Sequence, residues 1–161
     1  MPETCIITRL AAGYMAEIVA SPDTWDGGLA AQVARLAEGG FVLLLSPERR
    51  ILSRATPPDE GALTGARIVD VSHGWQPVLL EGRFARDLLT RGIELDLSPA
   101  AFAPGQAMAT LCARVPVILH AEAEDRFRLF VATSYADWLV DWLTAVLAPL
   151  SGAGTGAGVA A

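Results

Sequence analysis

The stretch AMATLCARVPVILHAEAEDRFRLFVATSYADWLVDWLTAV, residues 107–146, decides the fold class. Its first part, 107–120, is apolar and reads as one long strand region, in which Pro116 must sit at an edge or a bulge because it cannot donate to a ladder. An acidic turn follows at 121–126, and 127–132 is the expected return strand. Two strands followed by a helix indicate an α+β arrangement.

The final helix has the clearest pattern in the chain. Ser134 is the expected N-cap, and Asp137 three residues later completes a motif much like a capping box. The apolar side chains that follow recur at helical spacing, which predicts an amphipathic helix. These residues are Tyr135, Trp138, Leu139, Trp142, Leu143 and Val146.

The region before this stretch predicts a second strand–helix pair. Residues 66–80 alternate apolar and polar positions around a central Ser-His-Gly, and we expect one strand there. Residues 82–91 predict a short helix closed by Gly92. Its basic residues, Arg83, Arg86 and Arg91, alternate with acidic ones and are expected to form a solvated face.

The first part of the chain reads as strand, helix, strand and strand. A strand-like segment at 4–19 is interrupted at 11–13, and Asp23 or Thr24 can cap a helix that runs to about residue 38. A strand, a turn and a strand follow over 41–54, before a Pro/Gly-rich break at 57–65.

The predicted fold class is therefore α+β, built from two small strand-helix-strand-strand halves. The expected divisions are an N-terminal half at 1–60, a C-terminal half at 61–150 and a flexible small-residue tail at 151–161.

Composition excludes two classes of partner. The formal charge is −6, and no basic stripe is present, so the chain is not expected to bind nucleic acid. No run approaches the roughly 20 apolar residues that a membrane helix needs. Hydrophobic residues nevertheless make up 52% of the chain and charged residues only 19%. This excess has two open explanations, which are burial against another protein and a high alanine content from a GC-rich genome.

The reactive residue types are isolated from one another. Cys5 and Cys112 lie in apolar segments, which predicts buried thiols and a reducing, cytoplasmic location, and the first twenty residues do not resemble a signal peptide. His73 and His120 lack neighbouring metal ligands, and Ser72 next to His73 on a strand would point to the opposite face. We interpret His120 as a core or rim histidine. The expected catalytic, cofactor-binding and metal-binding residues are accordingly none.

From residue 69 to 143 the sequence resembles the gamma subunit family of heterotetrameric sarcosine oxidase. The resemblance rests on several short motifs that occur in the same order and spacing. They are Asp70-Val71-Ser72-His73, Gly82, Gly92 with Leu95-Asp96-Leu97, Pro104-Gly105 and Ser134-Tyr135-Ala136-Asp137-Trp138-Leu139. Residues 1–65 match the family only loosely.

The resemblance implies more than the residues alone do. It implies a fold similar to the folate-binding aminomethyltransferase (T-protein) and a complex of alpha, beta, gamma and delta subunits that oxidises N-methyl amino acids. In that complex FAD, FMN, NAD and tetrahydrofolate are used, zinc lies in delta, and the gamma subunit holds no redox centre and packs on the folate-binding part of alpha. The implied role is a non-catalytic accessory subunit of an oxidoreductase.

A partner would be met through exposed aromatic anchors. The residues expected to face it are Ser72, His73, Trp75, Trp138 and Trp142. An equally open alternative makes 72–75 an internal strand with a bulge at Gly74. Two other functions also stay open: a stand-alone tetrahydrofolate-binding domain in one-carbon transfer, and a scaffold domain unrelated to either family.

Overall fold

Two antiparallel sheets form the framework of the protein. The computed structural model describes residues 5–37, 39–59 and 63–152. The five-stranded sheet has the order β1-β6-β9-β8-β7, and the four-stranded sheet has the order β3-β4-β2-β5. The strands of the two sheets are β1 (Ile6–Arg9), β2 (Tyr14–Val19), β3 (Phe41–Ser46), β4 (Arg49–Arg54), β5 (Arg67–Asp70), β6 (Trp75–Glu81), β7 (Ala107–Cys112), β8 (Val115–Ala123) and β9 (Arg126–Ala132). The α+β prediction is confirmed.

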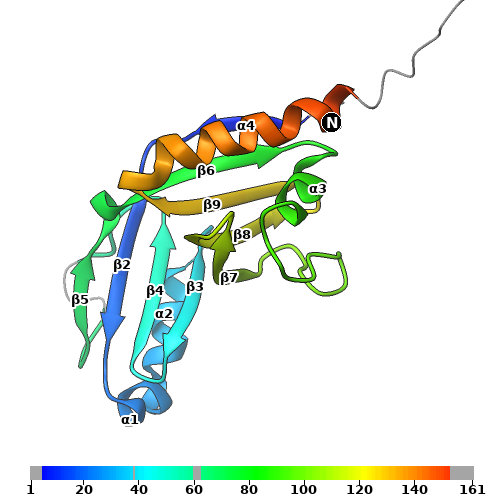
Figure 1. The fold of residues 1–161 in the computed structure, drawn as a ribbon. Helices are drawn as coiled ribbons and strands as arrows, with labels where there is room; N and C mark the ends of the chain where they lie inside the picture. The colour runs from blue at the N-terminus through cyan, green and yellow to red at the C-terminus, as the bar shows by residue number, and fades with distance from the viewer. Residues whose placement is uncertain (1–4, 38, 60–62, 153–161) are drawn as a thin grey trace, which may run out of the picture.

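The sheets and helices stack so that each sheet has two packed faces. Helix α4 (Ala136–Gly152) runs across the outer face of the five-stranded sheet, and α2 (Ala30–Leu36) lies behind the four-stranded sheet (Figure 1). A third apolar cluster lies between the sheets and includes Met15, Phe41 and Phe130. Because both faces of the central strands are covered, β6 and β8 contain the continuous apolar and buried runs 77–80 and 117–119.

The two sheets exchange strands. β1, near the N-terminus, pairs with β6 in the five-stranded sheet, whereas β5 pairs with β2 in the four-stranded sheet. The four-stranded sheet therefore extends past the expected division, from β2 to β5, and the five-stranded sheet combines β1 with β6 to β9. The expected division at residue 60 stays a prediction, and most of the expected tail at 151–161 lies outside the described residues.

Helix formation near the N-terminus uses a different cap from the expected one. Ser21 caps α1 (Pro22–Thr24), and its hydroxyl accepts from the Thr24 amide, so the prediction of Asp23 or Thr24 as the cap is wrong. The chain continues through a π-turn (Trp25–Leu29) into α2. Gly28 adopts φ 111° there, a conformation that glycine reaches without a steric cost.

The predicted strand over 66–80 is two strands in different sheets. β5 ends at Asp70, a 3₁₀ turn covers Ser72–Gly74, and β6 begins at Trp75. Alternation persists through the break because both flanking segments are strands, so periodicity alone could not reveal it.

The predicted long strand over 107–120 is likewise a hairpin of β7 and β8. Ala113 and Arg114 form its two-residue turn with positive φ values of 48° and 69°. Alanine and arginine are both unusual in such a turn, so the sequence pattern did not indicate a turn at this point. Pro116 pairs with β7 only, and the ladder to β9 begins at Val117, so the expectation of an edge position for this proline is met locally.

Two further helix features depart from expectation. Helix α3 (Ala85–Thr90) carries Arg86, whose guanidinium donates to the carbonyls of Leu97, Phe102 and Glu124, so this arginine ties loops together and is not part of a solvated face. Helix α4 follows a 3₁₀ turn over Thr133–Tyr135, and Asp137 pairs with Arg9 at 2.5 Å. The described residues show no capping bond from Ser134.

Candidate functional site

Exposed apolar side chains concentrate on the outermost strands of both sheets. Among the described residues, every large apolar strand residue that is exposed lies on β1, β3, β5 or β7, the four edge strands. They are Ile6, Leu44, Leu45, Ile68, Val69 and Leu111. Edge strands carry unpaired backbone groups, and monomeric proteins usually protect them with charges or short length. Apolar edges are therefore candidate contact surfaces.

The edges of the two sheets meet at β3 and β7, which lie against each other. Leu45 and Thr110 line one inter-sheet cavity, and Thr110 also lines a neighbouring groove with Leu95 and Leu111. We call Leu45, Leu95, Thr110 and Leu111 the edge patch. Leu95 is 49% exposed and Leu111 is 53% exposed. The edge patch thus places apolar side chains from both sheets and one loop on a shared surface.

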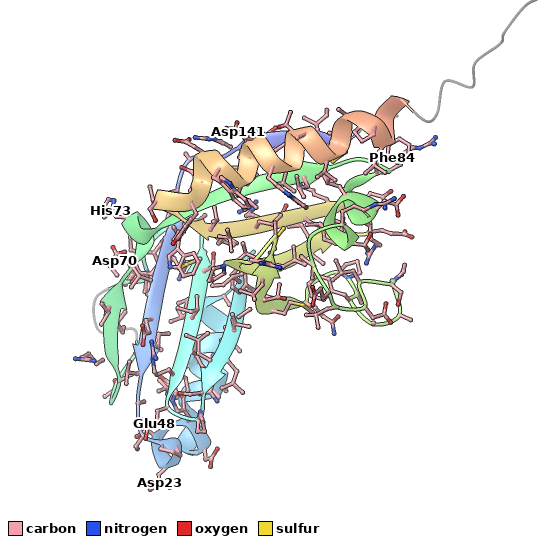
Figure 2. All side chains as sticks on the ribbon, in the orientation of Figure 1. Asp23, Glu48, Asp70, His73, Phe84 and Asp141 are labelled. Atoms are coloured by element: carbon pink, nitrogen blue, oxygen red, sulfur yellow. The ribbon has the colours of Figure 1, made fainter. Side chains whose placement is uncertain are left out.

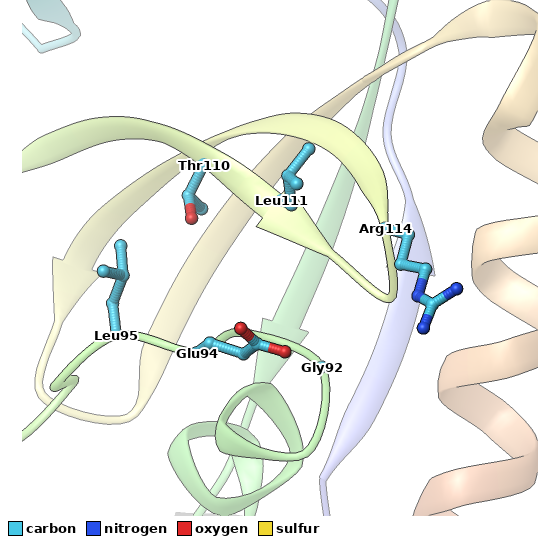
Figure 3. A pocket seen from close by; sticks show the side chains of 6 residues that line it. All are labelled: Gly92, Glu94, Leu95, Thr110, Leu111 and Arg114. Carbon is cyan, nitrogen blue, oxygen red and sulfur yellow. The ribbon is translucent and has the colours of Figure 1, made fainter.

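The groove in the edge patch has a volume of about 370 Å³. Figure 3 shows Leu95 and Thr110 pointing toward one another across it, with Glu94 and Arg114 also on its wall. The Ala113 amide donates to the Gly92 carbonyl at 2.8 Å and holds the hairpin against the loop. The groove can accept an apolar side chain of a partner, with one acidic and one basic group nearby to fix its orientation.

The predicted residue Ser72 has a structural role at the crossing between sheets. Its hydroxyl lies 2.5 Å from the Asp70 carboxylate and accepts from the Met15 amide at 2.9 Å. Hydrogen bonds from the Ser72 hydroxyl and amide hold the pKa of Asp70 below its usual range. Ser72 therefore bonds to Asp70 and Met15. The prediction that Ser72 and His73 lie on a strand and point to its opposite faces is wrong, because both residues lie in a 3₁₀ turn.

His73 is exposed in the same turn. Its carbonyl accepts from the Thr133 hydroxyl at 3.0 Å, which brings the turn beside the start of α4. Figure 2 shows Asp70 and His73 at this corner of the molecule. The open alternative of an internal strand with a bulge at Gly74 is wrong, because 72–74 form a 3₁₀ turn between strands.

The three predicted tryptophans separate into different environments. Trp75 is half-buried and lines the inter-sheet cavity of about 220 Å³. Trp142 is half-buried against Gly92, where an added Cβ would lie 2.7 Å from the Trp142 ring. Trp138 is 48% exposed and follows the exposed Tyr135. We call Tyr135 and Trp138 the helix patch. A partner-facing role for all five predicted residues stays a prediction.

The sequence reasoning did not identify the edge patch. The run Phe41 to Leu45 carried one usable signal, because five consecutive apolar residues leave no polar face for a strand. Leu111 and Leu95 gave no comparable signal, since each sits among ordinary apolar neighbours. Their exposure follows from sheet order and loop path, which periodicity does not encode.

The thiols lie in apolar surroundings, as predicted. Cys5 and Cys112 are buried and unpaired, and burial raises the pKa of each thiol to about 11. Both are protonated at neutral pH and are poor nucleophiles. Within the described residues, no three His, Cys, Asp or Glu side chains come together in a way that could hold a metal ion. Nor does that part of the chain contain a helix long and apolar enough to cross a membrane.

Known proteins share this sequence and fold. Residues 54–148, more than half of the chain, match the family described as "Sarcosine oxidase, gamma subunit family". The sarcosine oxidase subunit gamma of Arthrobacter sp. is 30% identical over 132 residues, covering 73% of this chain and 64% of the relative. That of Corynebacterium sp. (strain U-96) is 29% identical over 136 residues, covering 78% and 66%. The chain thus spans a little under two thirds of the length of these curated relatives.

The fold has a close counterpart among solved structures. A chain of the heterotetrameric sarcosine oxidase from Corynebacterium sp. U-96, in complex with pyrrole 2-carboxylate, superposes with a TM-score of 0.79 at 25% identity. The match covers 99% of this chain and 90% of that one, so it includes the first 65 residues, where the sequence motifs are weak. The extent of the sequence match and the shared architecture lead to one assignment: the chain belongs to the sarcosine oxidase gamma subunit family.

Proposed function

We propose that this chain is a cytoplasmic, non-catalytic gamma-type subunit of a multi-subunit oxidase or dehydrogenase acting on sarcosine or another N-methyl amino acid. The observation that carries the proposal is the placement of six exposed apolar strand residues on the four sheet edges. Family membership supports it, because the relatives are named as gamma subunits and the solved relative is heterotetrameric.

The edge patch is the part of the surface best suited to a permanent partner. Burying one fully exposed leucine side chain contributes about 1.5–3 kcal/mol, and Leu45, Leu95 and Leu111 are about half exposed, so covering them offsets part of the cost of association. The groove between Leu95 and Thr110 gives that partner a defined seat. The helix patch, with the exposed ring of Trp138, is a second contact.

The partners in this proposal are alpha, beta and delta subunits, with the folate-binding region of alpha covering the edge patch. FAD, FMN, NAD and tetrahydrofolate would then bind in those other subunits. The choice of alpha rests on the family resemblance. The chemistry of this chain is compatible with it, since its two thiols are buried and protonated.

Co-expression of the full chain with the alpha, beta and delta subunits of such a complex tests the proposal. Affinity purification through this chain should recover a stoichiometric flavin-containing complex with sarcosine-oxidising activity. Recovery of this chain alone, while the other three subunits assemble and oxidise substrate without it, would contradict the accessory role.

Titration of the purified chain with tetrahydrofolate separates this proposal from a stand-alone folate-binding domain. The accessory role predicts no saturable binding until the alpha subunit is added. Tight binding by the chain alone would favour the one-carbon transfer alternative.

A further inference from the structure

A second inter-sheet cavity is lined by polar and charged side chains, in contrast to the apolar edge patch. It has a volume of about 240 Å³. His120, Glu122 and Arg128 line it from β8 and β9, and Ser53 and Arg54 line it from the end of β4. Phe41 and Phe130 supply its apolar wall. Polar groups from two sheets therefore meet beside two aromatic rings.

Strand register explains why the polar groups converge there. Ile118 pairs with Phe130 and His120 pairs with Arg128, two positions further along the same face of β8 and β9. That face packs against the four-stranded sheet at Ile118 and Phe130. It therefore changes from apolar to charged within two residues, and the cavity opens where the change occurs.

His120 is built into the wall of the cavity. The residue is only 8% exposed, and its ring lies 4.9 Å from the Phe41 ring, centroid to centroid. Burial lowers the pKa of His120 below its ordinary value, which keeps the imidazole neutral at neutral pH. Within the described residues no hydrogen bond satisfies either ring nitrogen, so a neutral N–H donor is available to the cavity.

The arginines around the cavity exceed their acidic partners. Glu122 accepts from both Arg126 and Arg128, and Arg126 also pairs with Glu81 at 3.0 Å. The Arg128 Nε is buried with no acceptor, and Arg54 forms no ion pair among the described residues. Arg126 and Arg128 thus share the carboxylates of Glu81 and Glu122, and Arg54, which lines the cavity, adds a positive charge that has no ion-pair partner among the described residues.

We propose that this cavity binds a small carboxylate with a flat apolar body. The carboxylate lies between the Arg54 and Arg128 guanidinium groups, with the His120 ring beside it, and the body lies against Phe41 and Phe130. Guanidinium groups recognise carboxylates through parallel hydrogen bonds, and a low-dielectric site strengthens them. This inference goes beyond the subunit role and does not depend on it.

Histidine ring NMR of the full chain tests the proposal, with benzoate as the probe and benzamide as its neutral counterpart of the same shape. The chain has two histidines, so the exposed His73 is an internal reference. Benzoate should shift the His120 signals saturably and leave those of His73 in place, and benzamide should bind at least about tenfold more weakly because it has no charge to pair. An unmoved His120 signal, or equal responses to both probes, would overturn the proposal.

Arg54→Gln and Arg35→Gln form a matched pair of variants. Arg54 lines the cavity between the sheets, whereas Arg35 is exposed on α2, behind the four-stranded sheet to which β4 belongs. Arg54→Gln should weaken benzoate binding on the order of tenfold, and Arg35→Gln should bind as the wild type does. Unchanged affinity in Arg54→Gln would contradict the assigned contact. Cooperative thermal unfolding would verify that Arg54→Gln is folded. If the variant is not folded, the benzoate–benzamide comparison on the wild type decides.

Discussion

The Thr133 hydroxyl donates a hydrogen bond to the His73 carbonyl, with an oxygen–oxygen distance of 3.0 Å. This contact joins two 3₁₀ turns, one where the chain passes from the four-stranded to the five-stranded sheet and one where it enters α4. A single side chain therefore links the sheet crossing to the helix that covers the outer sheet.

Thr133→Val should lower the free energy of unfolding by about 1 kcal/mol, because it removes this hydrogen bond at nearly constant shape. Thr144→Val is the control, since its hydroxyl bonds only to Val140 one turn earlier in α4. The control should change stability by less than about 0.5 kcal/mol. Urea denaturation of both variants measures the difference, and equal losses would show that the corner contact adds nothing special.

Gly92, in the loop after α3, packs against Trp142 of α4. An added Cβ would lie 2.7 Å from the Trp142 ring and 3.0 Å from the Cys112 sulfur. Gly92→Ala should therefore destabilise the protein by about 1–3 kcal/mol through overpacking. Gly74→Ala, with nothing within 4 Å of its new Cβ, should be nearly neutral.

Thermal unfolding of the two alanine variants measures this contrast. Combining Gly92→Ala with Trp142→Phe should recover part of the loss, because the smaller ring makes room. If the double variant loses as much free energy of unfolding as the two single variants together, or more, the clash is not the cause.

Much of this architecture can be read from local pattern. The hairpin of β3 and β4, the helix up to Leu36 and the buried positions Leu139 and Leu143 of α4 all follow from periodicity and turn residues. The exchange of β1 and β5 between the sheets does not, because it depends on tertiary pairing. The turn at Ala113 and Arg114 was hidden for a related reason, since tertiary contacts impose a conformation that these residues do not prefer.

The candidate site was less readable than the fold. Aromatic residues were reasonable anchors, yet Trp75 and Trp142 are half-buried against other parts of the chain, and of the three predicted tryptophans only Trp138 is exposed, at 48%. Leu111, by contrast, was not predicted to face a partner. It is a contact candidate because it is exposed on the edge strand β7, a position that the sequence pattern does not reveal.

The thiols should be protected from modification in the folded protein. With a pKa of about 11, only roughly a thousandth of each thiol is ionised at pH 8, and the side chains are buried as well. Ellman's reagent should label neither cysteine in the native state at pH 8 and both in urea. Rapid native labelling would contradict the burial of Cys5 or Cys112.

The same thiols predict a pH dependence of stability. Their folded pKa lies above the ordinary value of 9.0, so the stabilisation is complete below pH 9 and is lost as the pH rises toward 11. The double variant Cys5→Ala, Cys112→Ala should show a flatter decline in the free energy of unfolding over this range. Parallel declines in both proteins would mean that other groups control alkaline unfolding.

The most direct measurement of the central claim compares Leu111→Glu with Ala34→Glu in the co-expressed complex. Leu111 lies in the edge patch, whereas Ala34 is exposed on α2, and both substitutions add one negative charge at an exposed position. Size-exclusion chromatography with light scattering should show Leu111→Glu incorporated into the complex about tenfold less than wild type, with unchanged unfolding of the free chain. Ala34→Glu should assemble normally. Full incorporation of Leu111→Glu would contradict the claim that the sheet edges hold this subunit in its complex.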